Sequence, residues 1–225
     1  MDHYQLKRII GSGSFGSVRL GEHKKSGVPC AIKSIRKSHL KKADVYQELN
    51  KNEFIVLEET VHPHITRVFE LMEDNRSYYI VMELISGGNL FDKIHSMHHF
   101  SEDKAASMIK QLCLALNYMH GLSIMHRDLK PENLLCEQSD DGEIIIKLTD
   151  FGFATYFDPD QPQTLSLGSP VYMSPELCLQ EPYDNKVDVW ATGVITYALL
   201  TGHAPFNGKG KDAIYKAVCE NEPDF

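Results

Sequence analysis

The first third of the chain alternates short apolar runs with polar, glycine-containing turns, a pattern typical of β-strands. Between the third run and the fourth, Val45, Leu49, Val56 and Leu57 recur at helical spacing and predict one amphipathic helix. Residues before 86 therefore predict a small sheet with one main helix. The predicted strands are YQLKRII (4–10), SVRLGEH (17–23), VPCAIKSI (28–35), HITRVFELM (64–72) and SYYIVMEL (77–84).

The period of the pattern changes after the glycine-rich stretch SGG at 86–88. A long amphipathic helix is predicted to start behind Ser101, a candidate N-cap, and to end near Gly121. The run IIIKL (144–148) predicts a short strand. VDVWATGVITYALL (187–200) is apolar nearly all round, which predicts a central buried helix.

Composition places the chain among ordinary globular proteins, with 225 residues of which 42% are hydrophobic and 24% charged. The net charge of −8 argues against nucleic-acid binding and suits a basic peptide partner. The five cysteines are scattered without a CxxC pair, so neither a zinc site nor a disulfide framework is indicated. Because no apolar run is long enough for a membrane span, we expect a cytoplasmic protein, and nothing in the composition argues against the nucleus.

The loop HRDLKPEN (126–133) places a carboxylate, an ammonium and a carboxamide close together, at Asp128, Lys130 and Asn133. Polar residues also gather in surface loops that have no chemical task. However, Asp150 ends the strand IIIKL, and carboxylate and amide oxygens are ligands that Mg²⁺ prefers. Asp128 is then left to act on a hydroxyl, and Lys130 to stabilise a moving phosphoryl group. The combination favours phosphoryl transfer from a Mg²⁺-nucleotide to an alcohol.

The glycine-rich stretch GSGSFGSV (11–18) has two interpretations. Its glycines either satisfy positive φ in a hairpin or let backbone amides approach phosphate oxygens. A dinucleotide fingerprint is disfavoured, because a strand and not a helix follows. Lys33 on the next strand is either an edge residue or a cation that Glu53 fixes against a phosphate.

Together these motifs resemble the eukaryotic protein kinase family over essentially the whole chain. GSGSFGSV, CAIK, Glu53, HRDLKPEN, DFG and SPE (174–176, where the family has APE) occur in the family's order. Lys130 resembles the serine/threonine type, and GGNLFDKI most resembles the calcium/calmodulin-dependent and calcium-dependent group. The resemblance implies an α+β bilobal fold, with a small antiparallel sheet lobe at 1–85 and a larger, mostly helical lobe at 86–225.

The resemblance also implies the cofactors ATP and Mg²⁺ and a role for each motif residue. Asp128 would be the proton acceptor, with Lys130, Lys33 and Glu53 as further catalytic residues, and Asn133 and Asp150 would hold the metal. The stacked column that joins the lobes would be Leu57, Val68, His126 and Phe151, and Asp188 would brace the turn at His126. The implied ATP-binding residues are Ile10, Gly11, Ser12, Gly13, Ser14, Phe15, Gly16, Val18, Ala31, Lys33, Met82, Glu83, Ile85, Asn89 and Leu135.

Regulation and substrate choice are implied by three further positions. Arg127 resembles an arginine that pairs with a phosphate on the activation segment, for which Thr164 and Ser166 are candidates. Ser169 stands where a Ser or Thr approaches the catalytic Asp and Lys. Asn89 replaces a Glu of basic-directed relatives while Glu132 remains, so we expect protein substrates with a moderate preference for basic residues upstream of the target hydroxyl.

Several alternatives stay open on the sequence. A pseudokinase or kinase-shaped scaffold would lack the motif residues that are present here, and a small-molecule kinase would lack the SPE segment. His95, His98 and His99 could chelate a metal but more often form a solvated helix end. A calcium-binding or calmodulin-binding part would lie outside these residues. In the family Glu176 pairs with a later arginine, and none follows here, so we expect a fragment or a shortened form with a weakened helical lobe.

Overall fold

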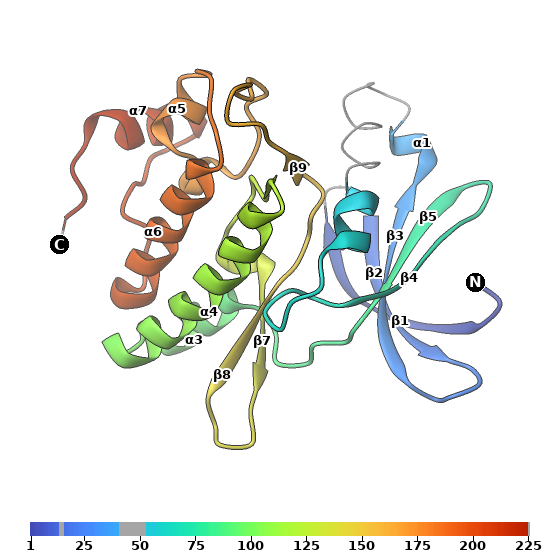
Figure 1. Ribbon diagram of the computed structural model, residues 1–225. Helices are drawn as coiled ribbons and strands as arrows, with labels where there is room; N and C mark the ends of the chain where they lie inside the picture. The colour runs from blue at the N-terminus through green and yellow to red at the C-terminus, as the bar shows by residue number, and fades with distance from the viewer. Residues whose placement is uncertain (14–15, 41–52, 225) are drawn as a thin grey trace.

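The computed structural model of the chain describes residues 1–13, 16–40 and 53–224. Its sheet-rich half lies on the right of Figure 1 and its helical half on the left, which confirms the α+β bilobal fold. The sheet is antiparallel, with the strand order β1-β2-β3-β5-β4. Its strands are Tyr4–Gly13 (β1), Gly16–His23 (β2), Pro29–Arg36 (β3), Val68–Glu73 (β4) and Ser77–Met82 (β5).

The middle strand, β3, is buried on both faces, because hydrophobic clusters lie on either side of it. Ala31 and Ile35 belong to the main core, and between them on the same face lies Lys33. A short helix, Lys37–Leu40 (α1), follows β3. The period-2 alternation thus directs the lysine to the inner side of the sheet and not to water.

The main helix of this half is described at residues 53–59. Its Val56 is fully buried and Leu57 is 7% exposed, as the spacing predicts. Val45 and Leu49, which the same pattern includes, lie outside the described residues.

The predicted strand at 64–72 is wrong over its first residues, because β4 begins only at Val68. The stretch before it pairs with the helical half of the chain instead. Leu148 donates its backbone NH to His64 O, and Thr66 donates its own to Leu148 O, both at 2.9 Å. Alternating hydrophobicity does not distinguish these two partners, since either one buries the same side chains.

The helical half is built on two helices that pack against each other, α4 and α6. Between them in the chain lie two short two-stranded sheets, β6 with β9 and β7 with β8. The helices are Leu90–Met97 (α3), Glu102–Gly121 (α4), Pro175–Cys178 (α5), Lys186–Thr201 (α6) and Lys211–Glu220 (α7), and the strands are Ile124–Met125 (β6), Leu134–Gln138 (β7), Ile144–Leu148 (β8) and Thr155–Tyr156 (β9).

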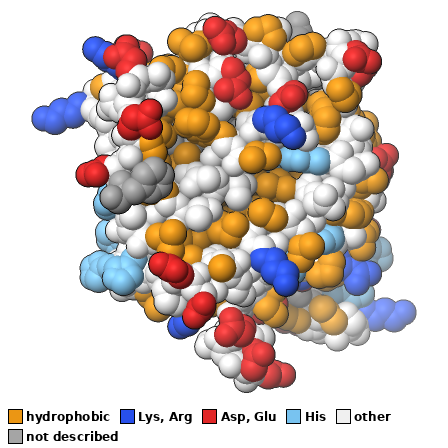
Figure 2. Space-filling view, turned by 60° about the vertical axis from the view of Figure 1, so that its left-hand side comes forward, with side chains coloured by type: hydrophobic (Ala, Val, Ile, Leu, Met, Phe, Trp, Pro, Cys, Tyr) orange, Lys and Arg blue, Asp and Glu red, His pale blue; other side chains and the backbone are white. Residues whose placement is uncertain are grey.

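Two sequence predictions for these helices need correction. Ser101 holds the N-cap position of α4, but its side chain makes no capping hydrogen bond. The predicted all-round burial of α6 is also wrong, because Val189 is 54% exposed and Leu200 is 40% exposed. Viewed from the side of the helical half, hydrophobic side chains alternate with charged ones across the surface (Figure 2). Within the described residues, no helix is both long and apolar enough to cross a bilayer.

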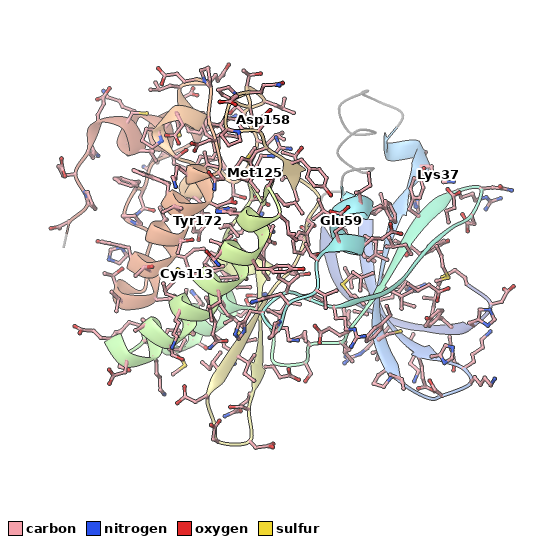
Figure 3. All side chains as sticks on the ribbon, in the orientation of Figure 1. Lys37, Glu59, Cys113, Met125, Asp158 and Tyr172 are labelled. Atoms are coloured by element: carbon pink, nitrogen blue, oxygen red, sulfur yellow. The ribbon has the colours of Figure 1, made fainter. Side chains whose placement is uncertain are left out.

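The two halves are held together at a few polar contacts beside the continuous core. Glu59, labelled in Figure 3 at the end of the helix at 53–59, accepts a hydrogen bond from Tyr156 of β9 at 2.6 Å. The hydroxyl of Tyr118 on α4 donates to Glu59 O at 3.2 Å and accepts from Val61 N at 3.1 Å. The helix at 53–59 is therefore fastened to the helical half at its C-terminal end, and its position is linked to that half.

The glycine that ends α6 gives a prediction about stability. Gly202 has a φ of 85°, and a Cβ there would lie 2.1 Å from His98 O. Gly202→Ala should destabilise the chain by about 1–2 kcal/mol through the left-handed backbone and by about 1–3 kcal/mol more through the clash. Urea unfolding measures this. Gly142→Ala is the control, since Gly142 has a φ of 88° with nothing within 4 Å. Equal losses for the two variants would contradict the clash.

Candidate active site

A cavity of about 1100 Å³ lies between the two halves. It is lined by residues of the sheet, of the connection after β5, of the loop before β7, of β7 itself and of residues 149–151, which follow β8. Most of the residues predicted to bind ATP line it, namely Ile10, Gly11, Ser12, Gly16, Val18, Ala31, Lys33, Met82, Glu83, Ile85, Asn89 and Leu135. Ser14 and Phe15 lie outside the described residues, and for Gly13 only its place at the end of β1 is described.

The glycine-rich stretch forms the end of β1 and the start of β2 and covers this cavity. Positive φ does not explain Gly11 or Gly16, because neither is among the described glycines with that conformation. At Gly16 the constraint is a close approach of strands, since a Cβ would lie 1.8 Å from Ser34 O. At Gly11 the nearest contact would be Val18 at 3.7 Å, an ordinary distance, so packing alone does not require that glycine.

The connection between the halves passes along the cavity. Glu83 donates its backbone NH to Arg67 O at 2.9 Å, and its carboxylate accepts from Lys147 at 2.9 Å. Ile85 makes no backbone hydrogen bond within the described residues, so its NH and C=O remain able to bond a flat heterocycle. Ile80, which the sequence analysis missed, also lines the cavity. Its position two residues before Met82 on one strand, and so on the same face, is the signal that could have found it.

Three segments far apart in the sequence meet at Lys33. Its Nζ donates to Glu53 Oε1 at 2.6 Å and to Asp150 Oδ1 at 2.8 Å. Lys33 is 9% exposed and Glu53 is 2% exposed, whereas 39% of the Asp150 side chain remains exposed. The edge-residue interpretation of Lys33 is therefore wrong, and the cation stands at the inner end of the cavity.

The charges of this cluster fix one another. Burial alone would lower the pKa of Lys33, but the carboxylates of Glu53 and Asp150 outweigh it and raise that pKa above its ordinary value. Burial raises the pKa of Glu53 against the opposing effect of Lys33. For Asp150 burial acts in the same direction, yet the contacts with Lys33 prevail and lower its pKa. Lys33 thus stays protonated, and Asp150 stays ionised.

The loop from His126 to Asn133 holds a second cluster. Lys130 Nζ donates to Asp128 Oδ2 at 2.7 Å and to Ser169 Oγ at 2.9 Å, and Ser169 Oγ donates to Asp128 Oδ1 at 2.9 Å. Asn133 Nδ2 donates to Asp128 O at 2.9 Å. The predicted approach of Ser169 to the acid and the lysine is confirmed. Asp128 is 6% exposed, with both of its carboxylate oxygens in hydrogen bonds.

A buried carboxylate supports the backbone of this loop. Asp188 accepts from the amides of His126 and Arg127, each at 2.9 Å, and from His120 Nε2 at 2.9 Å. Arg127 has a φ of 67°, a backbone conformation that costs about 1–3 kcal/mol and persists only where neighbouring contacts enforce it. The predicted bracing by Asp188 is confirmed, and it sets the position of the adjacent Asp128.

The predicted apolar column is present between the halves. Leu57 and Phe151 lie in one buried cluster, and Val68 packs against it. The ring of His126 meets that of Phe151 edge-on at 5.2 Å between centroids. Because Phe151 is buried, Asp150 beside it is directed towards Lys33 and the cavity.

The donor set at the cavity floor fits a hard cation shared with phosphates. Asp150 uses only Oδ1 on Lys33, and Asn133 uses Nδ2 on Asp128, so the described contacts leave Asp150 Oδ2 and Asn133 Oδ1 as acceptors. Both are oxygen donors, as Mg²⁺ prefers. No group of three His, Cys, Asp or Glu side chains among the described residues could hold a metal, so His95, His98 and His99 form no such group. Two protein oxygens require further ligands from a substrate.

Acidic side chains lie at the open edge of the cavity. Asn89 caps α3, with Oδ1 accepting from Asp92 N at 2.8 Å and Nδ2 donating to Asp92 Oδ2 at 3.0 Å. Asp92 and the exposed Glu132 line the cavity as well. The sequence analysis missed both α3 and Asp92, although Asn89 followed three residues later by the acidic Asp92 is a capping signal. An acidic group is thus present beside Asn89 even though Asn89 itself is neutral.

The segment between Gly152 and Pro175 places its candidate hydroxyls differently. Thr164 is exposed, whereas Ser166 Oγ donates to Leu177 O at 2.9 Å. Glu176 is partly exposed and has no ion-pair partner within the described residues. Tyr172, labelled in Figure 3 in the helical half, has a pKa raised by burial and then by nearby Glu132.

The electrostatics of Lys33 give a testable titration. Since burial alone raises the pKa of Asp150 and Lys33 lowers it, Lys33→Met should raise that pKa, observed as a carboxyl ¹³C titration without metal. In the wild type the ionised Asp150 stabilises the fold above its ordinary pKa, and this contribution is lost as the pH falls through the lowered pKa. Lys147→Met, which removes a lysine paired with Glu83, should leave the titration unchanged. An unmoved Asp150 pKa in Lys33→Met would contradict the assignment.

Comparisons with known proteins agree with this site. Residues 4–223 match the family described as the protein kinase domain. A Dictyostelium discoideum protein named as a myosin light chain kinase is 39% identical over 224 residues, which is all of this chain and 57% of the relative. Calcium-dependent protein kinase 4 of Plasmodium berghei is 42% identical over 96% of this chain and 41% of its own length. Myosin light chain kinase A of Dictyostelium discoideum is 40% identical, with 74% of it covered. The chain, which spans about half the length of the first two of these relatives, belongs to the protein kinase family and is similar to calcium-dependent and myosin light chain kinases.

Proposed function

We propose that the chain is the catalytic part of a serine/threonine protein kinase, which transfers the γ-phosphoryl group of ATP to a Ser or Thr hydroxyl of a protein. The observation that carries this is a pair of adjacent clusters, Lys33 with Asp150 and Lys130 with Asp128. Lys33, Lys130 and Asp150 line the cleft, and Asp128 lines an adjoining pocket together with Lys130 and Asp150. The first cluster supplies a fixed cation and a metal ligand, and the second supplies a proton acceptor beside a cation. Phosphoryl transfer requires both within reach of the same phosphate.

The nucleotide would lie in the cavity with its adenine edge at the connection after β5. The backbone groups of Glu83 and Ile85 would bond that edge, between Val18 and Ala31 on one side and Leu135 on the other. Lys33, held protonated by Glu53 and Asp150, would bind phosphate oxygens without first being reoriented. Mg²⁺ held by Asp150 and Asn133 would neutralise phosphate charge when bound.

Asp128 would accept the proton of the attacking hydroxyl. Its carboxylate is held on both oxygens, by Lys130 and Ser169, and its backbone by Asn133 and by the bracing of Asp188, so it cannot rotate away from an incoming substrate. Lys130 lies within 2.7 Å of Asp128 and would stabilise charge on the phosphoryl group in flight. Ser169 belongs to the segment that would receive the substrate chain, and it therefore links substrate binding to the position of the acid.

Substrate preference would follow from the acidic edge of the cleft. Glu132 is exposed, lies within the loop from His126 to Asn133 and lines the cavity, so it is available to a basic residue upstream of the target hydroxyl. Its charge is not committed to an ion pair within the described residues. An exposed pair contributes little, about 0.2–1 kcal/mol, so the preference should be moderate. The cytoplasmic location expected from composition stays a prediction.

A kinase-shaped scaffold without transfer is the second candidate. It would keep the fold and the cavity but need no ordered proton acceptor. Here Lys33, Glu53, Asp128, Asn133 and Asp150 are present and bonded to one another in the two clusters, which supports an enzyme.

Catalytic substitutions test this proposal by transfer of labelled phosphate from ATP to a basic peptide with one serine. Lys33→Met, Asp128→Asn and Asp150→Asn should each lower kcat about 10²–10³-fold, since each removes a charge that acts in the transition state. Asp150→Asn should also weaken Mg²⁺-dependent nucleotide binding, whereas Asp128→Asn should not. Asp140→Asn, in the exposed turn after β7, is the matched control. Normal turnover by Asp128→Asn would exclude it as proton acceptor.

The acidic edge gives a second prediction. Glu132→Gln should lower kcat/KM about twofold to fivefold for a peptide with an upstream arginine, because an exposed ion pair is lost. The same peptide with alanine in place of the arginine should be unaffected. Glu137→Gln, also exposed and on the following strand, serves as the control. A similar loss for both peptides would assign Glu132 to some other role than recognition of the basic residue.

A further inference from the structure

A buried tyrosine connects the catalytic loop to the segment that precedes Ser169. Tyr183 is 4% exposed, and its hydroxyl accepts from Arg127 Nη1 at 3.1 Å and donates to Leu165 O at 2.7 Å. Arg127 directly precedes Asp128, and Leu165 lies four residues before Ser169. One hydroxyl therefore joins the residue before Asp128 to the segment that leads to Ser169, and Ser169 is in turn hydrogen-bonded to Asp128.

The backbone of the same tyrosine holds the same segment. Tyr183 N donates to Gln163 O, and Gln163 N donates to Tyr183 O, both at 2.9 Å. Together with the hydroxyl bond to Leu165, three hydrogen bonds fix residues 163–165 on Tyr183. The following turn packs against the catalytic loop, because a Cβ on Gly168 would lie 2.9 Å from Arg127 O.

The guanidinium of Arg127 is occupied at its other end too. Its Nε donates to Phe153 O at 2.7 Å, and the residue is 5% exposed. Arg127 thus joins the start of the segment, at Phe153, to its later part through Tyr183. The described contacts give it neutral oxygen acceptors and no carboxylate.

The sequence around Thr164 and Ser166 is poorly suited to a phosphate that would hold the activation segment in place. The sequence has no lysine or arginine between Lys147 and Lys186, and the interval contains Asp158, Asp160, Glu176, Glu181 and Asp184. A phosphate on Thr164 or Ser166 would lie in an acidic stretch of sequence, and within the described residues the guanidinium of Arg127 is already engaged by Phe153 and Tyr183. A doubly charged group usually needs several cationic donors to order a loop.

We propose that Tyr183 is a positioning residue for transfer, which holds the activation segment through Arg127 and Leu165 so that activity does not depend on a phosphate at Thr164 or Ser166. The proposal rests on the proposed kinase function and specifies how that site is kept in order. It makes the hydroxyl of Tyr183, and not the ring, the group that matters, because the ring also fills a hydrophobic cluster with Met173 and Leu177.

The test uses the full chain, treated with phosphatase and assayed with MgATP and a serine peptide. Wild type and the double variant Thr164→Ala/Ser166→Ala should transfer phosphate within about twofold of untreated protein. Tyr183→Phe should lower kcat/KM for the peptide about tenfold, because two buried partners lose their bond, and should leave the KM for ATP unchanged. Tyr197→Phe, the same substitution at a buried position on α6, should have no such effect.

Two further measurements separate positioning from plain stability. Tyr183→Phe should speed amide hydrogen exchange of residues 163–168, and Tyr197→Phe should not; this readout needs no turnover. In a double-variant cycle, adding Tyr183→Phe to Arg127→Gln should lower kcat/KM no further than Arg127→Gln alone, since both substitutions break the same hydrogen-bonded connection between Arg127 and Leu165. Unchanged exchange, or losses that multiply, would overturn the proposal.

The outcomes also distinguish this proposal from the function on which it rests. If no sample shows transfer that Asp128→Asn removes, the proposed function fails and the positioning role fails with it. If wild type transfers phosphate but loses it after phosphatase treatment, or if Tyr183→Phe remains fully active, only the positioning role is overturned.

Discussion

The arrangement of both halves depends on one ammonium group shared by two carboxylates. Lys33 comes from the sheet, Glu53 from the helix beside it and Asp150 from the helical half. A buried ion pair contributes little when compared with apolar packing, but loss of one partner leaves a charge without compensation. Removal of any one of the three groups would therefore leave a charge in the cleft without its partner. Because Asp150 comes from the other half, the charges of the site are paired only when the two halves lie in this relative position.

Two of the five described non-glycine residues with positive φ lie where that arrangement meets the catalytic loop. Arg127 and Asp150 both have positive φ, which is uncommon for residues other than glycine. Each is over-determined by its surroundings, the first by Asp188 and by its guanidinium contacts, the second by Lys33 and by the buried Phe151 beside it. Tertiary contacts enforce the strain, so the two carboxylates that face the cleft, Asp128 and Asp150, are held in place by the core of the helical half.

The buried and the exposed parts of the site match the functions proposed for them. The groups that would act on phosphate are buried or half-buried and have fixed partners. Glu132, which would contact a peptide, is exposed at the edge of the cleft. Fixed charges stabilise a transition state without reorganisation, while exposed charges give modest preferences among substrates. Carboxylates of the same chemical type thus have different proposed functions according to whether they are buried or exposed.

The sequence alone determined the elements that local pattern and chemistry control. Alternation predicted the strands of the sheet, helical periodicity predicted α4, a run that is apolar nearly all round predicted α6, and the motif residues predicted the cleft. It could not decide contacts that depend on distant partners. Residues 64–66 pair with Leu148 of β8 and not within the sheet, Val189 and Leu200 of α6 face outwards, and Tyr183 engages Arg127. Hydrophobicity records whether a side chain is buried but not against which segment. Hydrogen bonds between residues far apart in the chain form only after packing has brought those segments together.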